Sequence, residues 1–282
     1  MADVFGLDDE ALAAHPTIYA PGAYAGRTAL VSGGAGGIGR ACAWLVGRLG
    51  GRVALAGRDE ARLAGAVAAM RAKGVDARAY VVDIREPASV DALFKRVADE
   101  TGTIDLLVNS AGGQFPQAAI DFSEKGWNTV VNTNLSGTWR MMQAAARGWR
   151  DAGKPGAIVN IVVVTRQGLH GVAHTIAARA GVVALSQTLA VEWAPLSIRV
   201  NCIAPGAIET PGWRVYDAAA RATYAHSNPM MRVGAAWEVA EACAYLGGAG
   251  AEYVTGETLH VAGGAQLWGE TWTIAKPDYF RV

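Results

Sequence analysis

Cysteine is scarce in this sequence, and its spacing is uninformative. Three cysteines occur among 282 residues, at Cys42, Cys202 and Cys243, with no CxxC pair and no cysteine–histidine cluster. That spacing argues against a disulfide framework and against a zinc site. Because all three have apolar neighbours in the sequence, we expect buried free thiols. No pair of acidic residues or other cluster suggests a metal site of a different kind.

An excess of charge is also missing, since 25 basic residues balance 25 acidic ones. Nucleic-acid-binding proteins usually carry a basic face, so we expect no such partner. No apolar run approaches the roughly 20 residues that cross a bilayer, and the acidic start MADVFGLDDE is unlike a signal peptide. We therefore expect a protein of the cytoplasm that binds a small-molecule substrate and no membrane.

What the sequence does contain is a regular alternation of β-type and helical runs. Most of the β-type runs are continuous Val, Ile, Leu and Ala, which is typical of parallel strands buried on both faces. The alternation predicts an α/β fold: one doubly wound Rossmann-type domain, with a seven-stranded parallel sheet and helices on both faces. The expected strands are 28–32, 52–56, 77–82, 104–109, 157–164, 198–203 and 258–261, and the expected helices are 37–49, 60–73, 88–100, 124–152, 172–193 and 236–247.

The segments outside this alternation divide the chain further. We expect an irregular leader over 1–26 and a single dinucleotide-binding and catalytic domain over 27–265. Within that domain the long connection 204–234 is expected to be a substrate lid, because long connections in compact domains are usually functional. The tail 266–282 holds Trp268, Trp272, Tyr279 and Phe280, so we expect it to pack on its own core or on a neighbouring subunit.

A glycine-rich segment follows the first strand and begins the first helix. Glycines there allow positive φ and let a pyrophosphate approach the backbone and the helix N-terminus. Two spacings fit at once, GxGxxG and GxxxGxG, the first with Gly34 in its leading position and the second with Gly33. The segment predicts a dinucleotide site, with contacts from Gly33, Ala35, Gly36, Gly37, Ile38 and Gly39.

The end of the second strand indicates which dinucleotide binds. A site for NAD usually has a carboxylate there, for the ribose 2′-hydroxyl. Here Gly57 and Arg58 occupy the place, and Asp59 is better suited to capping the next helix. Since an arginine can pair with a 2′-phosphate, we expect NADP(H) as the cofactor. The alternative is that Arg58 is a solvated surface side chain.

Taken together, the motifs resemble those of the short-chain dehydrogenase/reductase family over Arg27–Ala265. The matches are the glycine loop, VDI after the third strand, NSAG after the fourth, NLSG in the long helix, LAVEW at the end of the next and NCIAPG after the sixth strand. The resemblance implies a dimer or tetramer. It also implies cofactor contacts from Asp83 and Ile84 to adenine, from Asn109, Ala111 and Gly112 along the cofactor, and from Pro205, Gly206, Ile208 and Thr210 at the nicotinamide end.

The catalytic positions of that family are altered here. Its members usually have a serine in the fifth strand, then a tyrosine, then a lysine four residues later. In this chain a valine stands for the serine, Thr175 for the tyrosine and Arg179 for the lysine, while Asn134 keeps the fourth position. A threonine hydroxyl does not readily ionise, and an arginine stays charged. Alcohol oxidation needs a base for the hydroxyl proton, which these residues do not provide, whereas hydride addition to a conjugated thioester needs only hydrogen-bond donors for the enolate oxygen.

One segment narrows the resemblance. The pattern IVNI, then Thr165, then HTIAARAGV from His174 looks like the trans-2-enoyl-CoA reductase branch of the family, from which it departs at Ile176. The 2,4-dienoyl-CoA reductases are related to this branch. Some bacterial terpenoid-alcohol dehydrogenases share the same signature. Thr175 and Arg179, spaced i and i+4, are expected on one helix face toward the nicotinamide, Thr175 as a donor to the substrate carbonyl and Arg179 on the ribose of the cofactor. The alternative is a threonine that bonds back to its own helix and an arginine in a surface ion pair. His174 is a candidate proton donor or a structural histidine.

Further candidates surround this set. The loop after the fifth strand is expected to line the pocket, through Thr165, Arg166, Gln167 and His170. A basic mouth for a phosphopantetheine arm could be built from Arg166, Arg214, Arg221 and Arg232. Four tryptophans on long helices are expected in the core or at subunit contacts, namely Trp127, Trp139, Trp149 and Trp193.

Three hypotheses follow. The first is an NADPH-dependent reductase of a conjugated carbonyl compound, most plausibly an enoyl thioester. The second is an alcohol or ketone oxidoreductase in which His174 or a water transfers the proton. The third is a nucleotide-binding pseudoenzyme that serves as a scaffold.

Overall fold

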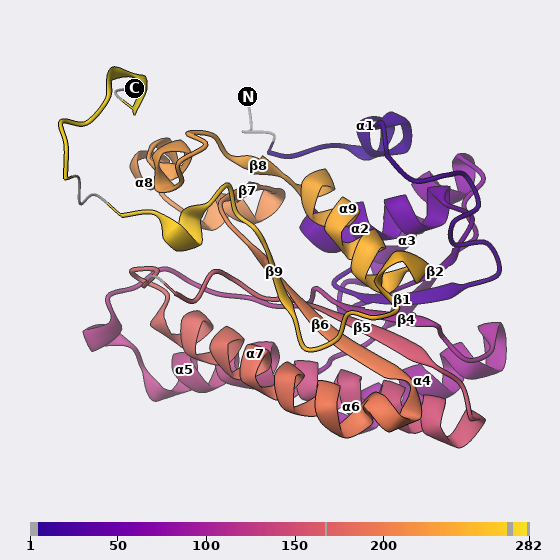
Figure 1. Ribbon diagram of the computed structural model, residues 1–282. Coiled ribbons are helices and arrows are strands. Elements are labelled where there is room, and N and C mark those ends of the chain that lie inside the picture. The colour runs from indigo at the N-terminus through magenta and orange to yellow at the C-terminus, as the bar shows by residue number, and fades with distance from the viewer. Residues whose placement is uncertain (1–4, 167, 270–272, 281–282) are drawn as a thin grey trace.

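The computed structural model describes residues 5–166, 168–269 and 273–280. Within them a seven-stranded parallel sheet has the order β3-β2-β1-β4-β5-β6-β9, which confirms the predicted fold class (Figure 1). The strands of this sheet are β1 (Thr28–Ser32), β2 (Arg52–Gly57), β3 (Ala77–Val81), β4 (Leu106–Asn109), β5 (Gly156–Ile161), β6 (Ile198–Pro205) and β9 (Thr258–Val261). A separate two-stranded ladder joins β7 (Ile208–Glu209) to β8 (Gly234–Ala235).

Helices cover both faces of the sheet (Figure 1). One layer contains α2 (Gly37–Arg48), α3 (Glu60–Ala72) and α9 (Ala236–Gly247), and the other contains α4 (Pro87–Thr101), α5 (Glu124–Val131), α6 (Thr138–Ala152) and α7 (Ala173–Trp193). The short helices α1 (Asp9–Ala14) and α8 (Ala218–Ala222) lie outside these layers.

Two hydrophobic cores form because the central strands are apolar on both sides. In β1, Leu30 packs into the core beneath α4 and α6, whereas Val31 packs into the core beneath α2 and α9. Large aromatic side chains fill each layer, with Trp44 of α2 on one side and Trp149 of α6 on the other, both fully buried. The continuous apolar runs of the sequence are thus explained by burial on two faces. The three cysteines are buried and free, as expected.

The expected helix 124–152 is interrupted. A π-helical turn, Asn132–Gly137, separates α5 from α6 and contains Asn134. The Asn134 side chain bonds to the backbone of Gly113 in a neighbouring loop instead of pointing to solvent. π-Turns inside α-helices are frequent at functional sites, and this one places an amide that the sequence pattern could only locate in a helix interior.

Two other expectations need correction. The fifth strand ends at Ile161 and not at residue 164, because the chain turns away at the edge where the site lies. The leader is not wholly irregular: α1 begins where the Asp8 side chain accepts a hydrogen bond from the Ala11 N–H. Among the described residues, no helix is both long and apolar enough to cross a membrane.

The leader is held to α2 by polar contacts. Asp9 forms an ion pair with Arg40 and accepts a hydrogen bond from Nε1 of the buried Trp44 at 2.8 Å. Arg48 donates to the backbone oxygens of Leu12 and His15 at 3.0 and 2.7 Å. The leader is therefore a fixed part of the domain and not a solvated arm.

Asp9→Ala is expected to lower the free energy of unfolding by about 1–3 kcal/mol, because it leaves the buried Trp44 N–H and the Arg40 guanidinium without their acceptor. Urea denaturation followed by circular dichroism measures this. The matched control is Asp151→Ala, which removes an exposed pair with Arg150 and should cost less than about 0.5 kcal/mol. Equal stability of the two variants would contradict the anchoring function of Asp9.

Candidate active site

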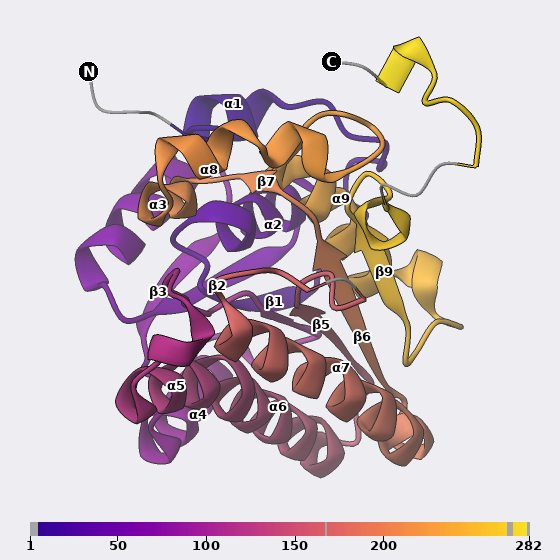
Figure 2. The same ribbon diagram turned by 90° about the vertical axis from the view of Figure 1, so that its left-hand side faces the viewer.

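The predicted site residues come together at the carboxyl edge of the sheet, on the side that faces the viewer in Figure 2. The glycine loop after β1, the NSAG segment after β4 and the segment after β6 meet there. A Cβ added to Gly33 would lie 2.8 Å from the Ala111 nitrogen, and one added to Gly37 would lie 3.6 Å from Cβ of Thr210. Three segments far apart in the sequence thus form one continuous surface.

Backbone geometry decides between the two glycine spacings. Gly33 and Gly37 have φ of +72° and +51°, which side-chain-bearing residues rarely adopt. A Cβ at Gly39 would lie 2.5 Å from the Gly33 oxygen, so no larger residue fits there. The GxxxGxG spacing therefore contains the two glycines that need positive φ, while Gly34 of the other spacing is also closely packed, since a Cβ there would lie 2.9 Å from the Val31 oxygen. Ala35, Gly36 and Ile38 lie in the same turn, between β1 and the first residues of α2.

The ends of β2 and β3 present charged side chains. Arg58 is exposed at the end of β2, and Asp59 caps α3 by accepting a hydrogen bond from the Arg62 N–H at 3.0 Å, as expected. Asp83 after β3 pairs with Arg85, whose guanidinium lowers the pKa of that carboxyl group to about 2. Ile84 is buried beside the π-turn residue Gly137.

Thr175 and Asn134 form a buried hydrogen-bonded pair. Asn134 Nδ2 donates to Thr175 Oγ1 at 2.8 Å, and its amide group also exchanges two hydrogen bonds of 2.9 Å with the backbone of Gly113. Both side chains are about 1% exposed. Because the Thr175 oxygen accepts from Asn134, its own proton is available to a group on the other side. Thr175 therefore does not bond back to its own helix, which was the alternative.

Arg179 lies one helical turn further along α7, and its guanidinium is buried. Nη1 donates to the Ile161 oxygen at 2.8 Å, and a Cβ at Gly112 would lie 2.1 Å from Nη2. Among the described residues no carboxylate forms an ion pair with it, so the alternative of a surface pair is wrong. Burial lowers the pKa of Arg179 to about 10, which leaves the group charged at neutral pH.

His174 lies in a different environment from Thr175. Its ring is fully buried, stacked on Phe122 at 4.5 Å and edge-on to Phe115 at 4.5 Å between centroids. Burial lowers the pKa of His174 below its ordinary value, so the ring is neutral near pH 7. This aromatic environment favours the structural interpretation of His174 over a function in proton transfer.

The remaining residues predicted to line the pocket are mostly exposed. Thr165 is half-buried and Arg166 and His170 are exposed, while Gln167 lies outside the described residues. Of the expected basic mouth, Arg232 is committed to an ion pair with Glu238, and Arg221 lies over the Phe5 ring, 4.9 Å from its centroid. A mouth of four arginines is therefore not formed.

The tail and the long helices hold the remaining aromatic residues. Trp268 stacks on Phe280 at 5.5 Å, and Trp272 lies outside the described residues. Trp149 is a core residue, whereas Trp139 stacks on Trp193 at 6.5 Å on adjoining helices. Trp127 is 38% exposed.

A chain of buried polar side chains behind the site was not predicted from the sequence. Asn109 donates to Asn160 at 2.9 Å, and Asn160 donates to Ser186 of α7 at 2.9 Å, all three being buried. This chain ties β4 and β5 to α7. A second contact that was not predicted joins Gln114 to the Tyr216 hydroxyl and so links the loop after β4 to the connection 204–234. The hydrogen-bonded chain of side chains could have been predicted from Asn160, an asparagine inside an otherwise apolar strand.

The comparisons with known proteins agree with this architecture. A family model described as enoyl-(acyl carrier protein) reductase matches residues 33–266. The 3-oxoacyl-[acyl-carrier-protein] reductase of Escherichia coli is 36% identical, covering 86% of this chain and 99% of its own. A probable 2,4-dienoyl-CoA reductase of Bacillus subtilis is 33% identical, with coverage of 86% and 97%.

Among solved structures, the citronellol catabolism dehydrogenase of Pseudomonas aeruginosa has a TM-score of 0.80 at 34% identity, covering 89% of this chain and 99% of its own. An actinorhodin polyketide ketoreductase variant solved with NADPH has a TM-score of 0.81 at 34% identity, with coverage of 86% and 98%. These matches extend over nearly the whole domain. The chain is therefore an oxidoreductase of the short-chain dehydrogenase/reductase family.

Proposed function

We propose that this chain is an NADPH-dependent reductase of the C=C bond in α,β-unsaturated thioesters. The observation that carries the proposal is the buried cation Arg179, which has no counter-charge among the described residues and lies one turn from the hydroxyl of Thr175. A buried charge without a partner is costly. It is explained if negative charge develops beside it during the reaction.

The residues at the carboxyl edge fit a dinucleotide. The N-terminus of α2 has no side-chain cap, and its first turn contains no acidic residue, so its N–H groups are available to a pyrophosphate. Gly33, Gly37 and Thr210 would surround that group. Arg58, exposed at the end of β2, would pair with a 2′-phosphate, and the ketoreductase neighbour solved with NADPH supports this choice of cofactor.

Thr175 and Arg179 would act on the thioester oxygen. When bound, the reduced nicotinamide would supply a hydride to the β-carbon. The π electrons of the C=C bond then move toward the thioester carbonyl, so that an enolate forms on the substrate. The Arg179 cation and the Thr175 O–H would stabilise the enolate oxygen, while Asn134 holds the Thr175 oxygen from behind. The α-carbon then takes a proton from water, which completes the saturated thioester.

Reduction of a ketone is the alternative that the relatives raise, since one of them is named a 3-oxoacyl-[acyl-carrier-protein] reductase and another a polyketide ketoreductase. That reaction forms an alkoxide, which needs a proton at once. Thr175 is a weak acid, and the His174 ring lies between two phenylalanines. The enolate spreads its negative charge over carbon and oxygen, so its oxygen is less basic than an alkoxide oxygen, and donors can stabilise it until the α-carbon is protonated. Absence of turnover on both substrate classes would favour the pseudoenzyme.

We also propose a homo-oligomer that works in the cytoplasm. Val191 on α7 is 78% exposed and Leu196, just beyond that helix, is 40% exposed, which leaves apolar surface beside the Trp139–Trp193 stack. Contact between copies of α6 and α7 would cover this surface. The three free thiols suit a reducing compartment.

The first test uses NADPH carrying deuterium at C4, with trans-2-enoyl-CoA esters and matched 3-oxoacyl-CoA esters. We expect deuterium at the β-carbon of a saturated product. Thr175→Val should lower kcat about 100-fold by removing one donor, whereas Thr188→Val, at an exposed hydroxyl on the same helix, should leave it unchanged. Deuterium on a carbinol carbon alone would identify a ketone reductase instead.

The position of Arg179 can be tested through Gly112. Gly112→Ala puts a methyl group where Nη2 lies and displaces the guanidinium, so turnover should fall about 100-fold, as a displacement of about 1 Å can cause. Gly113→Ala is the control, because a Cβ there meets nothing within 4 Å. Steady-state kinetics and melting temperatures compare the two. Equal activities would show that the placement of the cation is unimportant.

The pH profile separates the two proton routes. With Arg179 and Thr175 as donors, kcat should be flat from about pH 6 to about pH 9 and should fall as pH rises through the Arg179 pKa of about 10. If His174 donated the proton, kcat would instead fall as pH rises through a pKa below 6.5, because the donor must be protonated. Stopped-flow measurement at saturating NADPH gives the profile.

A further inference from the structure

The backbone conformation at Gly36 does not require a glycine. Its φ of −164° is extended and open to any residue. The obstacle lies outside the loop: a Cβ at Gly36 would be 2.7 Å from Nη2 of Arg62, and no other residue than Arg62 comes within 4 Å. The missing side chain therefore makes room for a guanidinium that reaches the loop from the first turn of α3.

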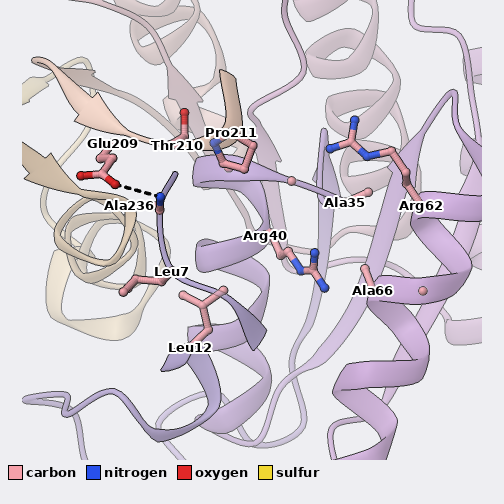
Figure 3. Close-up of a pocket in the computed structure, with 14 residues that line it drawn as sticks. Leu7, Leu12, Ala35, Arg40, Arg62, Ala66, Glu209, Thr210, Pro211 and Ala236 are labelled. Atoms are coloured by element: carbon pink, nitrogen blue, oxygen red, sulfur yellow. Dashed lines mark hydrogen bonds between the residues drawn. The ribbon is translucent and has the colours of Figure 1, made fainter. Parts of the chain in front are cut away.

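Arg62 and Gly36 share the wall of a cavity of about 350 Å³. Figure 3 shows the Arg62 side chain extending from α3 toward the loop at Ala35. The other walls come from the leader, α2 and the segment after β6. The cavity thus lies at the glycine-rich loop, between the first turn of α2 and α3, and Arg58 stands in the chain directly before Asp59, the cap of α3.

The charges around this cavity are unequally committed. Arg40, on the same wall, is paired with Asp9 of the leader. The Asp59 carboxylate is used as the cap of α3, through the backbone of Arg62 and not through its guanidinium. Within the described part of the chain, no acidic side chain forms an ion pair with Arg62. The carboxylate of Glu209, which also lines the cavity, accepts a hydrogen bond from the Gly6 N–H at 3.1 Å. The Arg62 guanidinium, on an exposed residue and beside Gly36, is therefore available to an anion.

We propose that Arg62 is a specificity-determining residue, which binds the 2′-phosphate of the cofactor together with Arg58 and occupies the space left by Gly36. The inference rests on the proposed use of NADPH. One guanidinium comes from Arg58, directly after β2, and the other from Arg62 in the first turn of α3, where it lies beside Gly36. A doubly charged phosphate accepts hydrogen bonds from both, whereas a free 2′-hydroxyl needs neither.

The test is the binding of two mononucleotides that differ only in the 2′-phosphate, 2′,5′-ADP and 5′-AMP, measured by isothermal titration calorimetry on the full chain. Arg62→Gln should weaken 2′,5′-ADP about 10- to 100-fold, the loss of one charge-assisted hydrogen bond. It should change 5′-AMP less than about twofold, the margin expected when no bond is lost. Arg147→Gln, an exposed change on α6, is the control and should alter neither.

A second variant tests the shared space. Adding Gly36→Arg to Arg62→Gln returns a cation to the same place and should restore most of the preference for 2′,5′-ADP. Unchanged 2′,5′-ADP binding in Arg62→Gln, or an equal loss for both nucleotides, would overturn the proposal. If the unmodified chain itself fails to prefer 2′,5′-ADP, the choice of NADPH fails and this inference with it. Failure of enoyl thioester reduction alone would leave Arg62 unaffected.

Discussion

The site depends on one buried guanidinium held in a fixed place. Arg179 donates to the last residue of β5, and its other nitrogen lies against Gly112 after β4. These contacts fix a positive charge at the carboxyl edge of two neighbouring strands. The cost of desolvating that charge is visible in its lowered pKa. Buried, desolvated charges of this kind are common at functional sites, where they interact with a ligand or a reacting atom.

Asn134 couples the other parts of the site to this charge. The π-turn lets its amide reach the backbone of Gly113 on one side and the hydroxyl of Thr175 on the other. The loop after β4, the break between α5 and α6, and the start of α7 are therefore mutually positioned. The polar chain from Asn109 to Ser186 lies behind them and ties β4 and β5 to α7, so these side chains are fixed in place by buried hydrogen bonds.

Much of the fold could be predicted because its signals are local. Apolar strand runs, the cap at Asp59 and the glycine turn each depend on neighbours in the sequence, and the structure bears them out. The end of β5 and the leader helix were harder to predict from the sequence. The 161–164 segment is apolar throughout although the strand ends at Ile161, and α1 is anchored by Arg40 and Trp44 from another helix. For the site, spacing placed Thr175 and Arg179 on one helix face but gave no information about what that face meets.

By itself the sequence determined the α/β class and the position of the glycine-rich loop, and it predicted a phosphate site at that loop and the replacement of the usual catalytic side chains. These properties follow from residue type, period and order along the chain. Only the tertiary structure decided that Gly33 and Gly37 adopt positive φ, that His174 is enclosed by aromatic rings, and that Arg62 fills the space at Gly36. Each of these depends on close approach between segments distant in sequence, where excluded volume and desolvation, and not local preference, set the outcome.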